Sequence, residues 1–203
     1  LADGNAYWFH IRTRDQARNW SPDAVHRGPY SIDATSPTNP TSLSSPSHQV
    51  GEWSKDNTIE VTWNAGADAL SGVGGYSIVW DNQSDTLPDT VTETLTLGNV
   101  SPAMPDSAEI RFHLRTADRA GNWTSGALRL GPFRVDATPP QNPTLHSSVP
   151  VGTWTNQRTI TVSWEGASDS GSGVAGYSCQ WNKQSATIPP ETIQTTGTES
   201  TSP

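Results

Sequence analysis

Six aspartates recur in three matching pairs along the chain, Asp15 with Asp118, Asp33 with Asp136 and Asp68 with Asp169. Five of them are candidate metal ligands at the joints between modules: Asp33, Asp68, Asp118, Asp136 and Asp169. If the loops carrying Asp68 and Asp118 share one end of a domain with the segment around Asp33, three carboxylates converge there, and Ca²⁺ prefers such hard oxygen ligands. A calcium ion would then fix the angle between neighbouring domains. The local alternative is that each aspartate closes its own Asx-turn without any metal, so no cofactor is required.

Two histidines stand at equivalent positions, each two residues before an arginine. His10 precedes Arg12, and His113 precedes Arg115. No second histidine or carboxylate accompanies either one at metal-ligand spacing, which favours a cross-strand surface role over metal binding or acid–base work.

Two tryptophans also recur, directly after an Asp-x-Ala-x-Asn turn. Trp20 and Trp123 each lie close in sequence to the exposed arginines, so we expect Arg12, Arg14 or Arg115 to stack on these rings as a cation–π pair. The alternative is an aromatic platform for binding sugars.

Four asparagines fit the acceptor pattern for N-linked glycans. These are Asn19, Asn82, Asn99 and Asn122. Glycans are therefore possible partners, although asparagine in such turns is also explained by its backbone preferences.

Motifs for catalysis are missing from the sequence. There is no nucleophile elbow, His-Glu-x-x-His or phosphate-cradling glycine loop, and Gly171-Ser172-Gly173 resembles a turn between strands. We therefore expect a protein that is not an enzyme.

Bulk composition narrows the remaining classes. The net charge of −8 argues against nucleic-acid binding, which needs a basic surface. No apolar stretch approaches the ~20 residues of a membrane span, and the one cysteine, Cys179, allows no intrachain disulfide. Cys179 shares an expected strand face with Tyr177 and Trp181, which predicts a small buried apolar thiol.

The elements that must position these residues come from an internal repeat. Residues 9–21 return about 100 residues later as 112–124, and residues 53–80 return as 154–181. We infer three segments: 1–34, the last two strands of a module; 35–138, a complete module; and 139–203, about five strands of a further module. The last and first segments are nearly complementary halves.

Period-2 alternation throughout predicts antiparallel strands, each with one buried and one wet face. Further strands are expected around Val91–Leu97 and Ala127–Val135. The expected core of the complete module consists of Trp63, Tyr76, Trp80, Phe112 and Leu114.

Three motifs carry a family resemblance. They are Trp63-(x)₄-Asp68-(x)₂-Ser71-Gly72-Val73-Gly74-Gly75-Tyr76, then Phe112-His113-Leu114-Arg115-Thr116-Ala117-Asp118-(x)-Ala120-Gly121-Asn122-Trp123-Thr124, and Asp136-Ala137-Thr138-Pro139-Pro140. The pattern resembles the fibronectin type III-like and immunoglobulin-like tandem repeats of bacterial secreted and surface proteins. That resemblance implies an all-β fold of Greek-key sandwiches and an extracellular or cell-surface location.

A structural role follows as the leading hypothesis. Tandem sandwich modules would form a stiff stalk, fibre, filament or sheath component whose partners are further copies of the repeat, joined head to tail in one chain or by strands from a neighbouring copy. The alternatives are a carbohydrate- or protein-binding adhesin module, or spacer domains of a larger secreted hydrolase.

Overall fold

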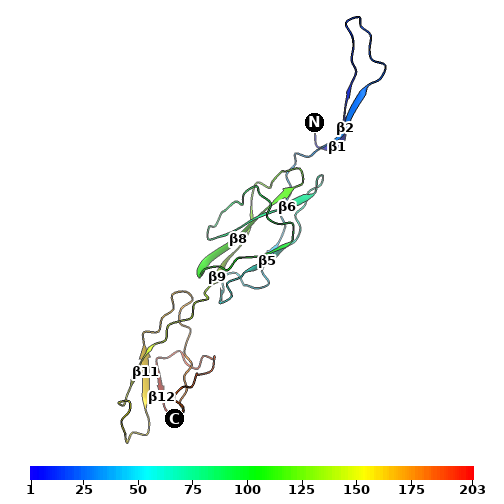
Figure 1. The fold of residues 1–203 in the computed structure, drawn as a ribbon. Coiled ribbons are helices and arrows are strands. Elements are labelled where there is room, and N and C mark those ends of the chain that lie inside the picture. The colour runs from blue at the N-terminus through cyan, green and yellow to red at the C-terminus, as the bar shows by residue number, and fades with distance from the viewer.

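The protein is built from β-strands and turns, without any helix. The computed structural model describes all residues, 1–203. Twelve strands follow one another along the chain (Figure 1): β1 (Gly4–Ile11), β2 (Val25–Ile32), β3 (Leu43–Ser44), β4 (Trp53–Ser54), β5 (Glu60–Trp63), β6 (Val73–Asp81), β7 (Gly98–Val100), β8 (Ser107–Asp118), β9 (Leu128–Val135), β10 (Thr144–Ser147), β11 (Thr161–Glu165) and β12 (Glu199–Thr201). The all-β expectation is confirmed, and no helix exists that could cross a bilayer.

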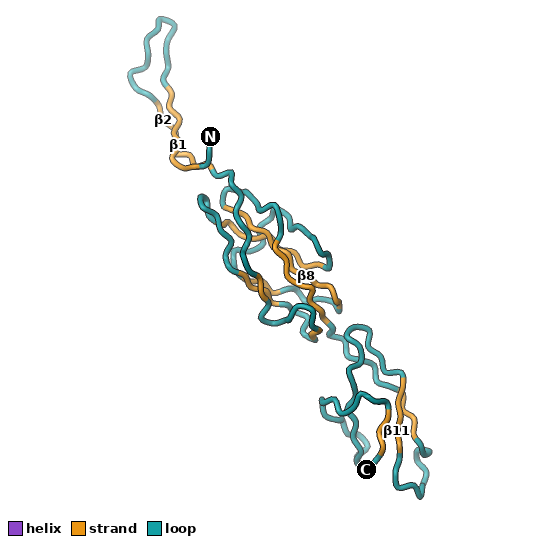
Figure 2. Tube along the Cα trace, turned by 180° about the vertical axis from the view of Figure 1, so that it is seen from behind, coloured by secondary structure: helices purple, strands orange, loops and turns teal.

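The strands gather into three bodies arranged in a row. The β1–β2 hairpin stands at one end, the largest body lies in the middle, and the sheet of β10, β11 and β12 lies at the other end (Figure 1). The view from behind shows the same elongated arrangement (Figure 2). The chain therefore extends lengthwise instead of folding back on itself.

The middle body consists of two sheets packed around one core. One sheet has the order β3-β5-β7 and the other has the order β4-β9-β8-β6. Nine buried apolar side chains from both sheets fill the space between them: Ile59, Val61, Trp63, Tyr76, Ile110, Phe112, Leu114, Phe133 and Val135. The apolar residues of the alternating pattern thus lie on the face of each strand that points toward the core.

Aromatic rings dominate this core. Phe112 stacks on Trp63 with ring centroids 5.6 Å apart, and it lies 4.8 Å from Trp80 in a tilted arrangement. Trp63, Tyr76, Phe112 and Leu114 are buried, as expected, whereas Trp80 is half-buried at the core's margin, where its indole N–H donates to Asn99 at 2.9 Å.

The expected strand at Val91–Leu97 is wrong. Val91 and Leu95 are exposed, and the strand that pairs with β5 is instead β7, just afterwards. The physical reason is a side chain: the backbone N–H of Ile78 donates to the Glu93 carboxylate at 2.9 Å, which replaces the ladder bond that a strand would supply.

The expected strand through Tyr177, Cys179 and Trp181 is also absent. Its counterpart β6 forms by pairing with β8, along a register that runs from Val73↔Asp118 to Asp81↔Arg111. Residues 177–181 have no such neighbour, and only Tyr177 makes an isolated bridge, to Thr195. A strand without a partner leaves its backbone groups to water.

The core packing predicts a large effect of truncating Phe112. Phe112→Ala should lower the free energy of unfolding of the middle body by about 3–5 kcal/mol, because it removes a ring that contacts both tryptophans. Urea denaturation measures this. Leu95→Ala, at an exposed position of the same body, is the control and should change it by less than about 0.5 kcal/mol; equal effects of the two substitutions would contradict this description of the core.

Candidate functional site at the joint between the hairpin and the middle body

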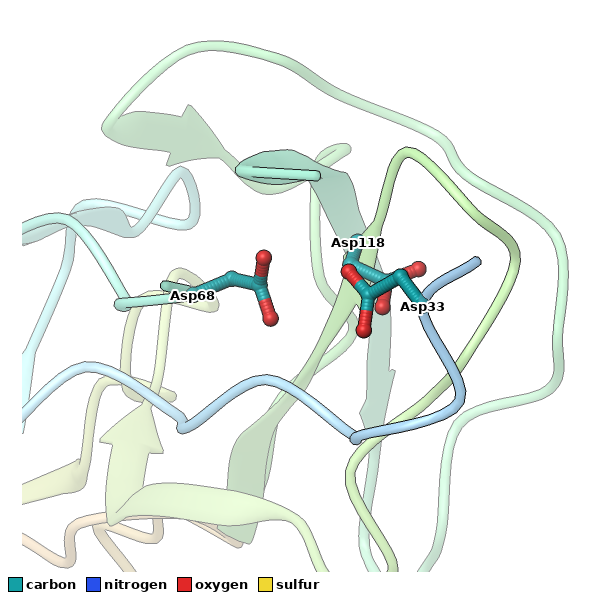
Figure 3. Close-up of side chains that lie close together, drawn as sticks. All are labelled: Asp33, Asp68 and Asp118. Carbon is teal, nitrogen blue, oxygen red and sulfur yellow. The ribbon is translucent and has the colours of Figure 1, made fainter. Parts of the chain in front are cut away.

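Asp33, Asp68 and Asp118 come together where the hairpin meets the middle body. One carboxylate oxygen from each lies within 4.8 Å of the others. Asp33 follows β2, Asp68 lies in the loop between β5 and β6, and Asp118 ends β8, so three separate elements supply the cluster (Figure 3). The convergence expected from the sequence is present, while calcium binding stays a prediction.

Asp33 ties the linker to the loop that follows β5. Its carboxylate accepts the backbone N–H of Ser71 at 2.9 Å and that of Thr35 at 3.2 Å. Its carbonyl oxygen accepts the side-chain N–H of Asn122 at 3.0 Å. Hydrogen bonds from the Ser71 side chain and backbone lower the pKa of Asp33 below its ordinary 3.8, because they favour the ionised form.

Asp68 shapes its own loop with a single oxygen. Its Oδ1 accepts the backbone N–H groups of Leu70 at 3.1 Å and Gly72 at 2.7 Å, which is an Asx-turn. Its other oxygen, Oδ2, accepts no hydrogen bond from the protein. Gly72 has a φ of +77°, a left-handed conformation that glycine adopts without strain.

Asp118 is buried and fully engaged in its turn. Its Oδ1 accepts the N–H groups of Ala120 at 2.9 Å and Asn122 at 2.8 Å, and its Oδ2 accepts the Asn122 side chain at 2.7 Å. Asp15 repeats the pattern, accepting the backbone and side chain of Asn19 at 2.7 and 2.9 Å. The hydrogen bonds of its turn therefore account for the position of the Asp118 carboxylate without a metal ion, which agrees with the alternative that each aspartate closes its own turn.

Electrostatics distinguish this cluster from an ordinary set of turns. Arg111 and Glu109 form an ion pair, and two histidines, His113 and His146, lie within 3.3 Å of carboxylate oxygens; none of these contacts involves Asp33, Asp68 or Asp118. The groups that donate hydrogen bonds to the three carboxylates are neutral N–H and O–H groups, and no basic side chain forms a salt bridge with them. The nearest basic side chain is that of Arg119, which lies close to Gly72 and lines the same surface pocket as Asp33. A hard cation could bind there through Asp68 Oδ2 and the remaining lone pairs.

At the second joint, between the middle body and the last body, Asp136 and Asp169 both accept hydrogen bonds from the loop at residues 171–173. Asp136 accepts the backbone N–H of Ser172 at 2.6 Å, and Asp169 accepts those of Gly171 at 3.1 Å and Gly173 at 2.7 Å. Hydrogen bonds from Ser172 lower the pKa of Asp136. The structure thus brings two of the predicted carboxylates together here, against three at the first joint.

The expectation that both recurring histidines lie on the surface is wrong for His113. His113 is buried, and its Nε2 lies 3.1 Å from Asp81 Oδ1 on the neighbouring strand β6. His10 is exposed and faces His26 across the hairpin, with their Nδ1 atoms 2.5 Å apart. Repeat-based reasoning missed His26 because Arg129 takes the same place in the middle body, opposite His113.

Arginine stacking on the recurring tryptophans is confirmed. The Arg12 and Arg14 guanidinium carbons lie 5.8 and 5.9 Å from the Trp20 ring centroid, and that of Arg115 lies 5.4 Å from Trp123. Arg115 also donates to the carbonyl oxygen of Thr124 at 2.7 Å, which ties the turn to the sheet. A sugar platform on Trp20 stays a prediction.

The four sequon asparagines differ in how free their side chains are. Asn122 donates both to Asp33 and to Asp118, and Asn19 donates to Asp15, so a glycan on either would break a turn contact. Asn99 is half-buried beside Trp80. Asn82 is exposed and its side-chain N–H groups make no protein contact, which makes it the sequon best suited to carry a glycan.

Comparison with known proteins gives no relative. No family model matches the chain, and no curated protein or solved structure matches it either.

The lowered pKa of Asp33 can be tested through Ser71. Ser71→Ala removes the hydroxyl donor, so the pKa of Asp33 should rise toward 3.8, as followed by NMR of the carboxyl carbons during a pH titration. In the unmodified protein the bonds to Asp33 stabilise the joint above its ordinary pKa, and this stabilisation is lost as the pH falls through the lowered pKa. Asp15, whose pKa is lowered by Asn19, is the internal control. A shift of both aspartates together would contradict the local cause.

Proposed function

We propose that the chain is an extracellular structural repeat protein, in which tandem immunoglobulin-like or fibronectin type III-like Greek-key sandwiches form a stiff stalk, fibre, filament or sheath component. The observation that carries the proposal is that both joints are built in the same way. Asp33 accepts the Ser71 N–H and Asp136 accepts the Ser172 N–H. Asp3 and Asp106 likewise accept the N–H of Ala34 and of Ala137, both at 2.8 Å.

Repeated joints of this kind favour a rod over a flexible string of domains. Each linker aspartate is held by N–H groups of the next module, and each Asp-Ala-Thr segment is held by an aspartate of the preceding one. Pro139 and Pro140 stiffen the second linker further. The elongated arrangement in Figures 1 and 2 agrees with such a role.

Strand order in the middle body supports the sandwich part of the proposal. A three-stranded sheet β3-β5-β7 faces a four-stranded sheet β4-β9-β8-β6, so chain neighbours often lie in opposite sheets. This is the kind of crossing that a Greek-key sandwich of about 100 residues requires.

Joint stiffness can be tested with a double substitution. Asp33→Ala with Asp136→Ala removes one hydrogen bond anchor from each joint, so small-angle X-ray scattering should show a broader distribution of distances and a shorter mean length. The control is Asp23→Ala, since the Asp23 carboxylate makes no hydrogen bond. An unchanged distribution in the double variant would mean that these bonds do not stiffen the joints.

Calcium is the proposed stiffening ion of the first joint. Three carboxylates, one with an oxygen free of hydrogen bonds, supply the oxygen donors and negative charge that Ca²⁺ favours, and backbone carbonyls or waters would complete its six to eight ligands. The ion would bridge the linker, the loop after β5 and the end of β8, so it would hold two modules at one angle.

Asp68→Asn is the clean test of calcium binding. The amide oxygen can keep the bonds to Leu70 and Gly72 while the charge and the free oxygen are lost, so affinity in a calorimetric titration should fall roughly tenfold or more. At calcium 100 times the dissociation constant, the unmodified protein should gain about 2.7 kcal/mol of stability. Asp169→Asn, at the joint with two carboxylates, is the matched control. No calcium-dependent heat or shift in melting temperature would refute the proposal for this ion, and turn formation would then explain the cluster.

A further inference from the structure

The last body exposes part of the apolar face that the middle body buries. Leu145 is 66% exposed and Trp181 is 38% exposed. Their neighbours Val162, Trp164 and Tyr177 line the same open groove, which has a volume of about 470 Å³. In the middle body the counterparts of these residues lie against β8 and β9, and Val61 and Tyr76 are almost completely buried, whereas Val162 and Tyr177 are half-buried. Trp164 is as buried as its counterpart Trp63, so the exposed part of the face is formed by the residues around it.

The hairpin at the other end exposes the missing side of such a core. Phe9 is 57% exposed, whereas its counterpart Phe112 is 0% exposed. Ile11 and Tyr30 are exposed in the same way, while their counterparts Leu114 and Phe133 are fully buried. Exposure of such an apolar face to water is unfavourable in free energy, and burial against another apolar surface would remove this penalty.

Both incomplete bodies already have the backbone arrangement of the complete one. In the hairpin, Tyr7↔Tyr30, Phe9↔Arg27 and Ile11↔Val25 repeat the partners Ile110↔Phe133, Phe112↔Leu130 and Leu114↔Leu128, including both irregularities of register. The pairs of β10, β11 and β12 likewise repeat those of β3, β5 and β7. Little rearrangement is needed before the two surfaces meet.

A stretch of backbone without a partner like β8 lies at the place where the hairpin would add. Residues 177–181 form no strand, although the same stretch of the middle body, within β6, pairs with β8 over its whole length. Adding β1 there would supply the missing hydrogen-bond partners, as in β-strand addition.

We propose that the β1–β2 hairpin of one copy of this chain docks on the last body of a second copy, in the places that β8 and β9 occupy in the middle body. The occupant is a second copy because the hairpin and the last body of one chain lie at opposite ends of the molecule (Figure 1). The inference rests on the proposed structural function and names the surface through which copies would join.

The middle body sets the register of this contact. Since Trp80 pairs with Phe112 and Ile78 with Leu114, Trp181 should pair with Phe9, and Cys179 with Ile11. Cys179 would then be buried at the contact, in the same way that its counterpart Ile78 packs against the core of the middle body. The surfaces on the two copies differ, so the contact is heterologous and repeats without closing, which makes a linear assembly.

Cross-linking tests the register directly in the 203-residue chain. Ile11→Cys places a second thiol opposite Cys179, the chain's one native cysteine. Under mild oxidation this variant should give a disulfide-linked ladder of trimers and larger species, since cross-strand partners lie within the ~4.4–6.8 Å Cα separation of a disulfide.

Two chains serve as controls for the ladder. The unmodified chain, with Cys179 alone, can form nothing larger than a disulfide dimer. Val25→Cys lies one strand beyond Ile11, about 9–10 Å from Cys179 in the docked register, which is too far for a disulfide. A ladder from Ile11→Cys alone supports the proposal; equal ladders from both variants, or dimers only, would overturn it.

A second pair of variants asks whether apolar burial drives the contact. Phe9→Lys puts a charge on the face that should enter the core, and sedimentation velocity should then show monomer at concentrations where the unmodified chain assembles. Trp8→Arg alters the opposite face, where the middle body itself has Arg111, and should leave assembly unchanged. Monomer for the unmodified chain at every concentration would overturn the docking. Scattering that still shows a stiff rod would preserve the proposed function, so the two failures are distinguishable.

Discussion

Coverage of one apolar sheet face is the constraint on which the rest of this structure depends. In the middle body, Phe112 lies between Trp63 and Trp80, and with it β8 and β9 close the core over β3, β5 and β7. Where that cover is missing, as over the last body, the strand equivalent to β6 does not form. The formation of one strand is therefore coupled to the presence of two others, because both its hydrogen bonds and its apolar face need them.

The joints depend on a different interaction, which acts between carboxylates and backbone N–H groups. Such bonds favour the ionised aspartate and so lower the pKa of Asp33 and Asp136, and each holds a linker against the next module. They are local and directional, whereas core burial is neither. Core burial sets the fold of each module, and the carboxylates set how one module follows the next.

Much of this was predictable because the repeat supplies an internal comparison. Alternation identified the core, and matching loops placed Asp33, Asp68 and Asp118 at one end, which the structure shows. Two features were not predictable from the same signals. One is the contact of His10 with His26, because the position that matches His26 holds no histidine. The other is the hydrogen bond from the Ile78 N–H to the Glu93 side chain, which replaces a ladder bond; the period-2 pattern of the sequence is the same whichever bond forms. Comparing the repeats shows only the features that the modules share, so a feature present in one copy alone cannot be predicted in this way.

Because the two incomplete bodies share the pairing of the complete one, covalent succession and docking between copies would form the same module. In either case the side chains that meet are the counterparts of Trp80 and Phe112, and the burial of apolar surface is the same. The difference lies in entropy: a covalent neighbour is held close by the linker, while a separate copy must lose its translational freedom on binding. Docking between copies therefore depends on concentration, whereas the hydrogen bonds at the joints act within each chain whether or not it has docked.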